Sequence, residues 1–217
     1  MRFIKLIGLT VLLTVTSFFT TASAQAQITF APLSSMRADY IRLFNGEPVQ
    51  VCQGEFVSLN RVHAVCEDLA DTVLNDFNRL EAGRITEVVL YDGVFYERIN
   101  DDTIWYAFND TIFDEPALEN LFQLQIERFA LSEQRVVGPV TIDGQATTHI
   151  QFGTEQQRFY YDLFITEDGY VLKDQFTTIR TIGDEVIEDV AIATYSAFNS
   201  DIVIGPPPAD QVVFADN

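Results

Sequence analysis

The sequence predicts an α+β fold that is mainly β, with antiparallel strands in one sheet and one amphipathic helix. Three Asp-Gly pairs, Asp92-Gly93, Asp143-Gly144 and Asp168-Gly169, each lie between runs rich in β-branched and aromatic residues. Asp-Gly favours a tight type I′ turn, whose twist matches that of antiparallel strands. One stretch, near residues 115–131, has helical rather than alternating spacing of its apolar residues. These observations predict a meander interrupted by a single helix.

The strands follow from apolar runs bounded by turn residues. Before the helix we expect strands over residues 36–44, 50–59, 62–66, 84–91, 94–99 and 103–108, and after it over 135–142, 146–152, 157–166, 170–181 and 186–197. Residues 67–80 are ambiguous, because their apolar residues fall near helical spacing. For them we expect a strand end followed by an irregular or short helical segment.

The helix has a start signal and an apolar stripe. Asp114 is a plausible N-cap, and Pro116 falls in the first turn, where its missing N–H costs nothing. One face of the helix then carries Leu118, Leu121, Phe122 and Phe129, widened by Leu124 and Ile126. A sheet with one helix either buries an apolar face beneath that helix or leaves room there for a ligand.

The first residues have the form of a signal peptide. Arg2 and Lys5 precede an apolar run over residues 6–19, and small residues follow at the spacing a signal peptidase reads, so we expect a signal peptide over 1–24 with cleavage after Ala24 or Ala26. An uncleaved N-terminal anchor is the alternative. No cysteine lies near the cleavage site, so we expect an exported protein, periplasmic or outside the cell, that is not lipid-anchored and has no stable membrane span. The expected organisation is a tether over 25–35, a single domain over 36–210 and a tail over 211–217.

The charge of the chain is strongly negative. The formal net charge is −19, and loss of residues 1–24 removes two basic and no acidic residues, which leaves −21. Such a surface repels phosphate backbones and anionic membranes, so we expect no nucleic-acid partner. The charge also keeps an aromatic-rich protein soluble. About 190 mature residues allow one domain with a real core, which we expect to be a monomer.

The cysteine count of two points to one disulfide. Cys52 and Cys66 flank an expected hairpin, and an even number of cysteines in an exported protein indicates a bridge. A bridge closing so short a loop stabilises by roughly 2–3 kcal/mol. Two reduced thiols are the alternative. We expect no metal site, because His63 and His149 are the only histidines and no paired-cysteine cluster exists.

Catalytic motifs are missing from the sequence. It contains no G-x-S-x-G, no H-E-x-x-H and no Gly-rich phosphate loop. The acidic pairs fall in expected turns or at the helix start, where solvated carboxylates are ordinary. We therefore expect no catalytic residues, no cofactor and no enzymatic activity; a pair of carboxylates converging in a cleft is the remaining enzymatic alternative.

Aromatic residues are the stronger signal, since they cluster in the expected strands. Alternate residues of a strand face opposite sides, so the consecutive rings of residues 159–161 lie on both faces of the sheet. Either one set packs under the helix while the other lies at the surface, or the rings line a concave surface for an apolar ligand.

Six features follow one another along the chain: residues 53–57 (QGEFV), 86–98 (TEVVLYDGVFYER), Trp105, 140–149 (VTIDGQATTH), 162–173, and 195–199 (YSAFN) with Pro206-Pro207-Pro208. In this order they resemble the LolA-like superfamily of exported lipoprotein and lipid carriers, especially its LppX/LprG-like branch. The resemblance spans about residues 50–210. It implies a strongly curved antiparallel sheet, an open half-barrel, with the main helix over its concave face and an apolar cavity between them.

The resemblance implies a binding protein without chemistry that shields a lipid or lipidated molecule. For the cavity wall we expect Leu121, Phe122 and Phe129 on the helix and Tyr96, Trp105 and Phe159 on strands. The alternative is a sensor or interaction module on the same fold, which contacts envelope proteins and whose core is filled by side chains.

Overall fold

A computed structural model describes the chain over residues 28–75, 78–109, 118, 120–128, 134–153, 158–182 and 184–215. The expected signal peptide lies outside these residues, as do Asp114, Pro116 and Phe129 of the expected helix. Among the described helices, none is long and apolar enough to cross a membrane.

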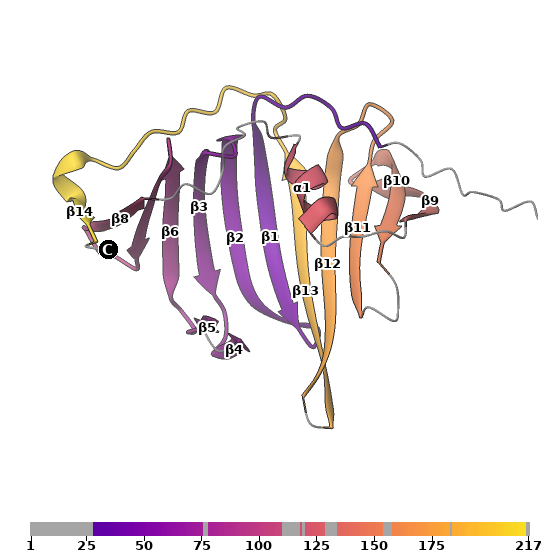
Figure 1. Cartoon of the computed structure of the whole chain (residues 1–217), viewed down its shortest axis with the longest axis horizontal. Helices are drawn as coiled ribbons and strands as arrows, with labels where there is room; N and C mark the ends of the chain where they lie inside the picture. The colour runs from indigo at the N-terminus through magenta and orange to yellow at the C-terminus, as the bar shows by residue number, and fades with distance from the viewer. Residues whose placement is uncertain are drawn as a thin grey trace, which may run out of the picture.

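Twelve strands form one large sheet, and two short strands form a second sheet. Figure 1 shows the large sheet spread across the view, with the helix in front of its middle. The elements are β1 (Met36–Phe44), β2 (Glu47–Ser58), β3 (Arg61–Asp68), β4 (Thr72–Asn75), β5 (Asn78–Leu80), β6 (Ile85–Tyr91), β7 (Val94–Ile99), β8 (Trp105–Asn109), α1 (Asn120–Arg128), β9 (Gln134–Ile142), β10 (Gln145–Phe152), β11 (Phe159–Ile165), β12 (Val171–Ile182), β13 (Glu185–Ser196), a 3-10 turn η2 (Ala209–Gln211) and β14 (Val212–Phe214).

The strand order is β14-β8-β7-β6-β3-β2-β1-β13-β12-β11-β10-β9. Every pair is antiparallel except β14 with β8. The expected mainly-β fold, with one helix and an antiparallel meander, is therefore confirmed. The strong curvature of a half-barrel stays a prediction.

Two meanders meet in the middle of the sheet. One runs through β1, β2, β3, β6, β7 and β8, and the other through β9 to β13. They join at the pair β1–β13, which we call the seam, with a register from Arg37↔Ser196 to Phe44↔Asp189. Across the seam Arg42 donates two hydrogen bonds to Asp189, at 2.8 Å and 2.6 Å, and both side chains are largely buried.

The Asp-Gly turns are of two kinds. Asp92 and Asp143 have φ of 48°, and the glycines after them have φ of 83° and 81°, as a type I′ turn requires. At the third pair only Gly169 has positive φ, at 88°. There Gly169 N–H donates to Thr166 C=O at 3.0 Å, and Thr166 N–H donates to Tyr170 C=O at 2.9 Å. The third pair is thus part of a wider turn than the sequence predicted.

The short helical segment allowed between residues 67 and 80 is wrong for the residues described there. β3 runs on to Asp68, and β4 and β5 form the second, two-stranded sheet. Asp68 is buried, and its carboxylate accepts from the backbone N–H of Glu81 at 3.1 Å. Leu80 is buried against Val49. These tertiary contacts outweigh the near-helical spacing of the apolar residues in this segment.

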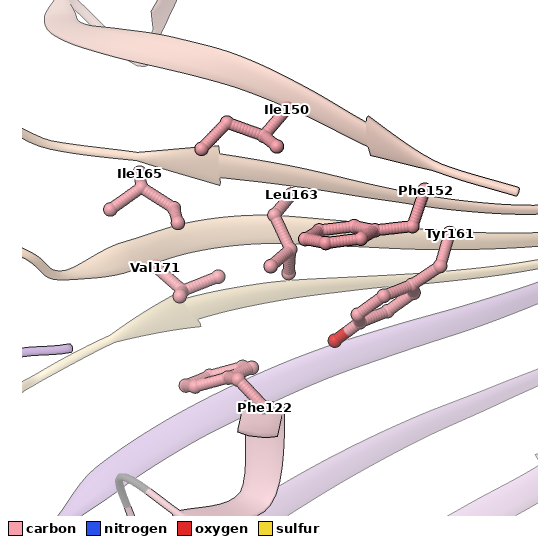
Figure 2. Packing of buried hydrophobic residues seen from close by; sticks show 7 residues of the cluster. All are labelled: Phe122, Ile150, Phe152, Tyr161, Leu163, Ile165 and Val171. Atoms are coloured by element: carbon pink, nitrogen blue, oxygen red, sulfur yellow. The ribbon is translucent and has the colours of Figure 1, made fainter. Parts of the chain in front are cut away.

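The helix α1 packs on the sheet through Phe122. Figure 2 shows this ring pointing from the helix toward side chains of β10, β11 and β12. The buried cluster that it completes consists of Phe122, Ile150, Phe152, Tyr161, Leu163, Ile165 and Val171. A neighbouring cluster, in which Leu121 packs against Met36, Leu59 and Leu118, extends this layer across the seam. We call this side of the sheet the helix face.

Part of the expected tether packs on the same face. Ile28, Phe30 and Leu33 lie against the cluster around Phe122, and the ring centroids of Phe30 and Phe122 are 5.5 Å apart. Ala31 N–H donates to Gly169 C=O at 2.9 Å, which holds the segment on the third Asp-Gly turn. Residues 28–35 therefore pack as part of the folded body, because Ile28, Phe30 and Leu33 contact the core and Ala31 is buried.

Part of the expected tail adds to the sheet at its other end. β14 pairs in parallel with β8, from Val212↔Trp105 to Phe214↔Ala107. Ile204 and Val212 pack on the cluster of Val89, Tyr96, Trp105 and Ala107. The chain end therefore covers the last strands of the first meander.

Candidate functional site

The sheet side opposite the helix face carries an aliphatic strip in its middle. Ile41 of β1 lies between Ile192 of β13 and Val51 of β2 in the strand register. Directly opposed residues of paired strands point to the same side of the sheet. Met36, Ala38 and Tyr40 alternate along β1 and face α1, so the next residue, Ile41, faces the opposite side. We call this side the groove face.

The same register adds two further aliphatic residues. In the row of Ile41, Val51 is followed by Glu67 of β3 and Ile85 of β6. In the row beside it, Thr194, Asp39, Gln53 and Val65 follow one another across β13, β1, β2 and β3. The uncovered face of an antiparallel sheet is normally polar, so five aliphatic residues at these positions are a departure from the pattern.

These two rows line a hollow of about 480 Å³. We call it the groove, and its lining is Asp39, Tyr40, Ile41, Val51, Cys52, Gln53, Val65, Glu67, Ile85, Ile192 and Thr194. Val65 and Ile85 remain 38% and 42% exposed, which is high for large aliphatic side chains. The groove is therefore an apolar surface that the described chain leaves open to solvent.

Polar side chains adjoin this apolar floor at defined places. Gln53 Nε2 donates to Asp39 Oδ1 at 3.2 Å, and Thr194 Oγ1 donates to the backbone C=O of Asp39 at 3.3 Å. Glu67 stands in the register between Val51 and Ile85. The lining contains these two carboxylates and neither lysine nor arginine. An apolar floor with a few fixed polar groups is the usual composition of a ligand site.

A disulfide ties two strands beneath the groove. Cys52 and Cys66 are directly opposed on β2 and β3 and are bonded to each other. The expected bridge is thus confirmed, and the alternative of two free thiols is excluded. Disulfides are typical of proteins that fold outside the cytoplasm.

The helix face, by contrast, is filled wherever it is described beneath α1. Phe122 is 1% exposed and meets the ring of Tyr195 edge-on at 5.2 Å between centroids. Tyr161 and Leu163 beneath it are equally buried. A ligand between α1 and these strands would have to displace the Phe122 ring.

One half-buried carboxyl lies on the helix face beside this apolar layer. Asp174 of β12 accepts hydrogen bonds from Tyr161 Oη at 2.9 Å and Tyr195 Oη at 3.2 Å. Burial raises the pKa of Asp174 from 3.8 to about 6, although the hydrogen bonds from both tyrosines favour the ionised form and oppose the rise. Burial also raises the pKa of both tyrosines well above 10, so they remain proton donors.

The residues expected to form one wall lie in two places. Leu121, Phe122 and Phe159 are on the helix face, and the ring of Phe159 packs edge-on against Phe176 at 4.3 Å between centroids. Tyr96 and Trp105 pack together on the groove face, in the cluster that Ile204 covers. Phe129 lies outside the described residues.

The floor of the groove was not among the expected site residues. The expected wall residues were chosen mainly as aromatic residues, whereas the groove floor consists of isoleucine and valine. The sequence did contain one signal for it. The expected strands carry aliphatic residues at both odd and even positions, and therefore on both faces of the sheet, as at Val88 and Val89. Only the register between strands shows which of them meet.

No protein-family model matches the chain, and no curated protein matches it. Similar solved structures include LprF from Mycobacterium bovis, at 13% identity and a TM-score of 0.48, with 81% of this chain and 90% of that chain covered. Lipoprotein LppX from Mycobacterium tuberculosis matches at 14% identity and a TM-score of 0.31, with 80% and 90% covered. The MucA/MucB complex of Pseudomonas aeruginosa matches at 17% identity and a TM-score of 0.36, with 82% and 54% covered.

LprF, LppX and MucB share the LolA-like fold that the sequence motifs resemble. Their TM-scores lie below 0.5.

Proposed function

We propose that the protein is an exported binding protein that shelters the apolar part of a lipid or lipidated ligand and performs no chemistry. The observation that carries the proposal is the groove of about 480 Å³ with its floor of Ile41, Val51, Val65, Ile85 and Ile192. Ligand sites of proteins commonly have about 300–1,000 Å³ and a mostly apolar lining.

The binding free energy would come from burial of the aliphatic floor and of the ligand chain. Each buried methylene contributes about 0.8 kcal/mol. About ten methylenes then contribute about 8 kcal/mol, against association costs of about 4 kcal/mol or more. At most about 4 kcal/mol of net binding free energy then remains, and because the groove is open on one side it removes only part of the chain surface from water, so we expect weak binding with a Kd of about 1 mM.

The groove favours a place for the ligand that differs from the expected one between the sheet and α1. On the helix face Phe122 already fills the described space, whereas Val65 and Ile85 are open to solvent. The filled helix face is also the observation that favours the second candidate function, a sensor or interaction module that contacts envelope proteins and holds no lipid. The two candidates differ in whether a small amphiphile binds.

The proposal is tested by titrating the mature protein with dodecyl maltoside, a neutral amphiphile, below its micellar concentration in a calorimeter. A variant with Val65→Thr and Ile85→Thr keeps β-branched residues but places two hydroxyls in the floor. We expect it to bind about tenfold more weakly.

The matched control is Val136→Thr with Val186→Thr, which changes two exposed valines of β9 and β13 outside the groove. It should bind as the wild type does. Absence of binding to the wild type, or equal affinities for the groove variant and the control, would contradict the proposal and favour the interaction module.

Native mass spectrometry of protein purified from its own host gives an independent test. A co-purifying mass that organic solvent removes and that is identified as a lipid supports the carrier. Repeated absence of such a mass, together with no uptake of a fluorescent lipid, counts against it.

A further inference from the structure

The geometry of the groove points to its ligand class: we propose that it selects single-chain amphiphiles whose polar end is an ammonium group. This inference rests on the proposed function and narrows it. It is carried by the two carboxylates that adjoin the aliphatic floor and by the pairing of the basic side chains around them.

Both carboxylates lie beside aliphatic residues that an alkyl chain would cover. Asp39 precedes Ile41 by two residues on β1, so both side chains point to the groove face. Glu67 lies between Val51 and Ile85 in the strand register. Both are exposed. A chain lying on the floor would therefore hold its polar end within reach of a negative charge.

Three basic residues on the same face are engaged elsewhere. Arg37 pairs with Glu55 at 2.9 Å, and the guanidinium of Arg98 pairs with Glu87. Lys173 is opposite Thr194 in the register, and its ammonium lies over the Phe164 ring, 5.2 Å from the centroid. None of the three lines the groove.

The lining thus carries two negative charges and no positive one, within a chain of net charge −19. The field of the whole protein and that of the groove have the same sign, so both attract a cationic amphiphile. An anionic headgroup, such as a phosphate or a carboxylate, meets repulsion from Asp39 and Glu67. Gln53 holds Asp39 by a hydrogen bond without neutralising it.

The test compares three amphiphiles with the same twelve-carbon chain: dodecyltrimethylammonium, dodecyl maltoside and dodecyl phosphate. Each is titrated into the mature protein by calorimetry, below its micellar concentration and at low salt. We expect the ammonium to bind about fivefold more tightly than the maltoside, and the phosphate to bind most weakly, since exposed charge pairs contribute modestly. High salt should reduce these differences.

The variant Asp39→Asn with Glu67→Gln removes both charges and keeps the size of the side chains. We expect its ratio of ammonium to maltoside affinity to fall toward one. The control Asp101→Asn with Glu185→Gln changes the net charge by the same amount at two exposed positions outside the groove, and it should keep the ratio.

The outcomes separate this inference from the function on which it rests. If none of the three amphiphiles binds, the proposed function fails. If all bind with equal affinity, the binding function stands and the selection for ammonium groups is wrong. If the ratio of ammonium to maltoside affinity falls as far in the control as in the groove variant, the overall charge of the protein sets the preference. The assignment to Asp39 and Glu67 is then overturned.

Discussion

Replacing Asp174 by asparagine should change how the stability of the protein depends on pH. This carboxyl is half-buried on the helix face and accepts hydrogen bonds from two tyrosine hydroxyls, and its removal from water raises its pKa from 3.8 to about 6. The folded protein therefore holds this proton more tightly than the unfolded chain does. Its contribution to stability is complete below about pH 4 and is lost as the pH rises through about 6.

The size of the effect follows from the pKa difference. One pKa unit corresponds to about 1.4 kcal/mol, so the rise from 3.8 to about 6 corresponds to about 3 kcal/mol. Asparagine stays neutral at every pH, and its Oδ1 can still accept from Tyr161 or Tyr195. Relative to the wild type, the free energy of unfolding of Asp174→Asn should therefore rise by about 3 kcal/mol between about pH 4 and pH 8.

Urea unfolding followed by circular dichroism measures this difference at each pH. Other carboxyls titrate in the same range, but they are common to both proteins and cancel. Asp201→Asn, at an exposed carboxyl, is the control and should show a flat difference. A difference between Asp174→Asn and the wild type that stays within about 0.5 kcal/mol over the whole range would refute the reasoning.

Three further substitutions test the packing. Phe122→Ala opens a cavity under α1 and should lower the free energy of unfolding by about 3–5 kcal/mol in urea; a loss below about 1 kcal/mol would mean that the layer is not packed. Replacing Cys52 and Cys66 together by alanine, at a separation of 14 residues, should cost about 3 kcal/mol, and a reducing agent should then have no further effect on the midpoint. Gly169→Ala brings a Cβ within 2.6 Å of Thr29 O at positive φ and should lower the melting temperature more than Gly46→Ala, whose Cβ meets nothing; equal losses would show that residues 28–31 do not dock there.

The strands and turns could be predicted because their signals are local. Asp92-Gly93 and Asp143-Gly144 adopt the positive φ angles that the hairpin signal requires. The disulfide could be predicted for a similar reason, since Cys52 and Cys66 flank one hairpin. Alternation within a strand is also local, so the two faces of each strand are known from the sequence.

The floor of the groove could not be predicted, because it depends on how strands far apart in the chain are paired. A shift of one residue moves every side chain of a strand to the other face. Trp105 and Phe159 are both aromatic strand residues, yet Trp105 is covered by Ile204 and Phe159 lies on the side of α1. The groove floor depends on Ile41 meeting Ile192, which is 151 positions away in the chain. No local pattern encodes that pairing.

The seam between β1 and β13 has a consequence for how the molecule folds. Each meander is built from neighbouring hairpins, whose short loops close in microseconds. The seam instead joins residues about 150 positions apart, so its loop-closure entropy is large and its pairing should form late. Substitutions in the seam, such as Arg42→Met, should then mainly accelerate unfolding and leave the refolding rate almost unchanged.

The groove crosses this seam, because Ile192 belongs to one meander and Ile41 and Val51 to the other. A ligand lying on the floor would bridge the two halves at the pairing that we expect to form late. A bound ligand would therefore slow the unfolding of the protein. The apolar chain of the ligand could be bound only after the sheet is fully assembled.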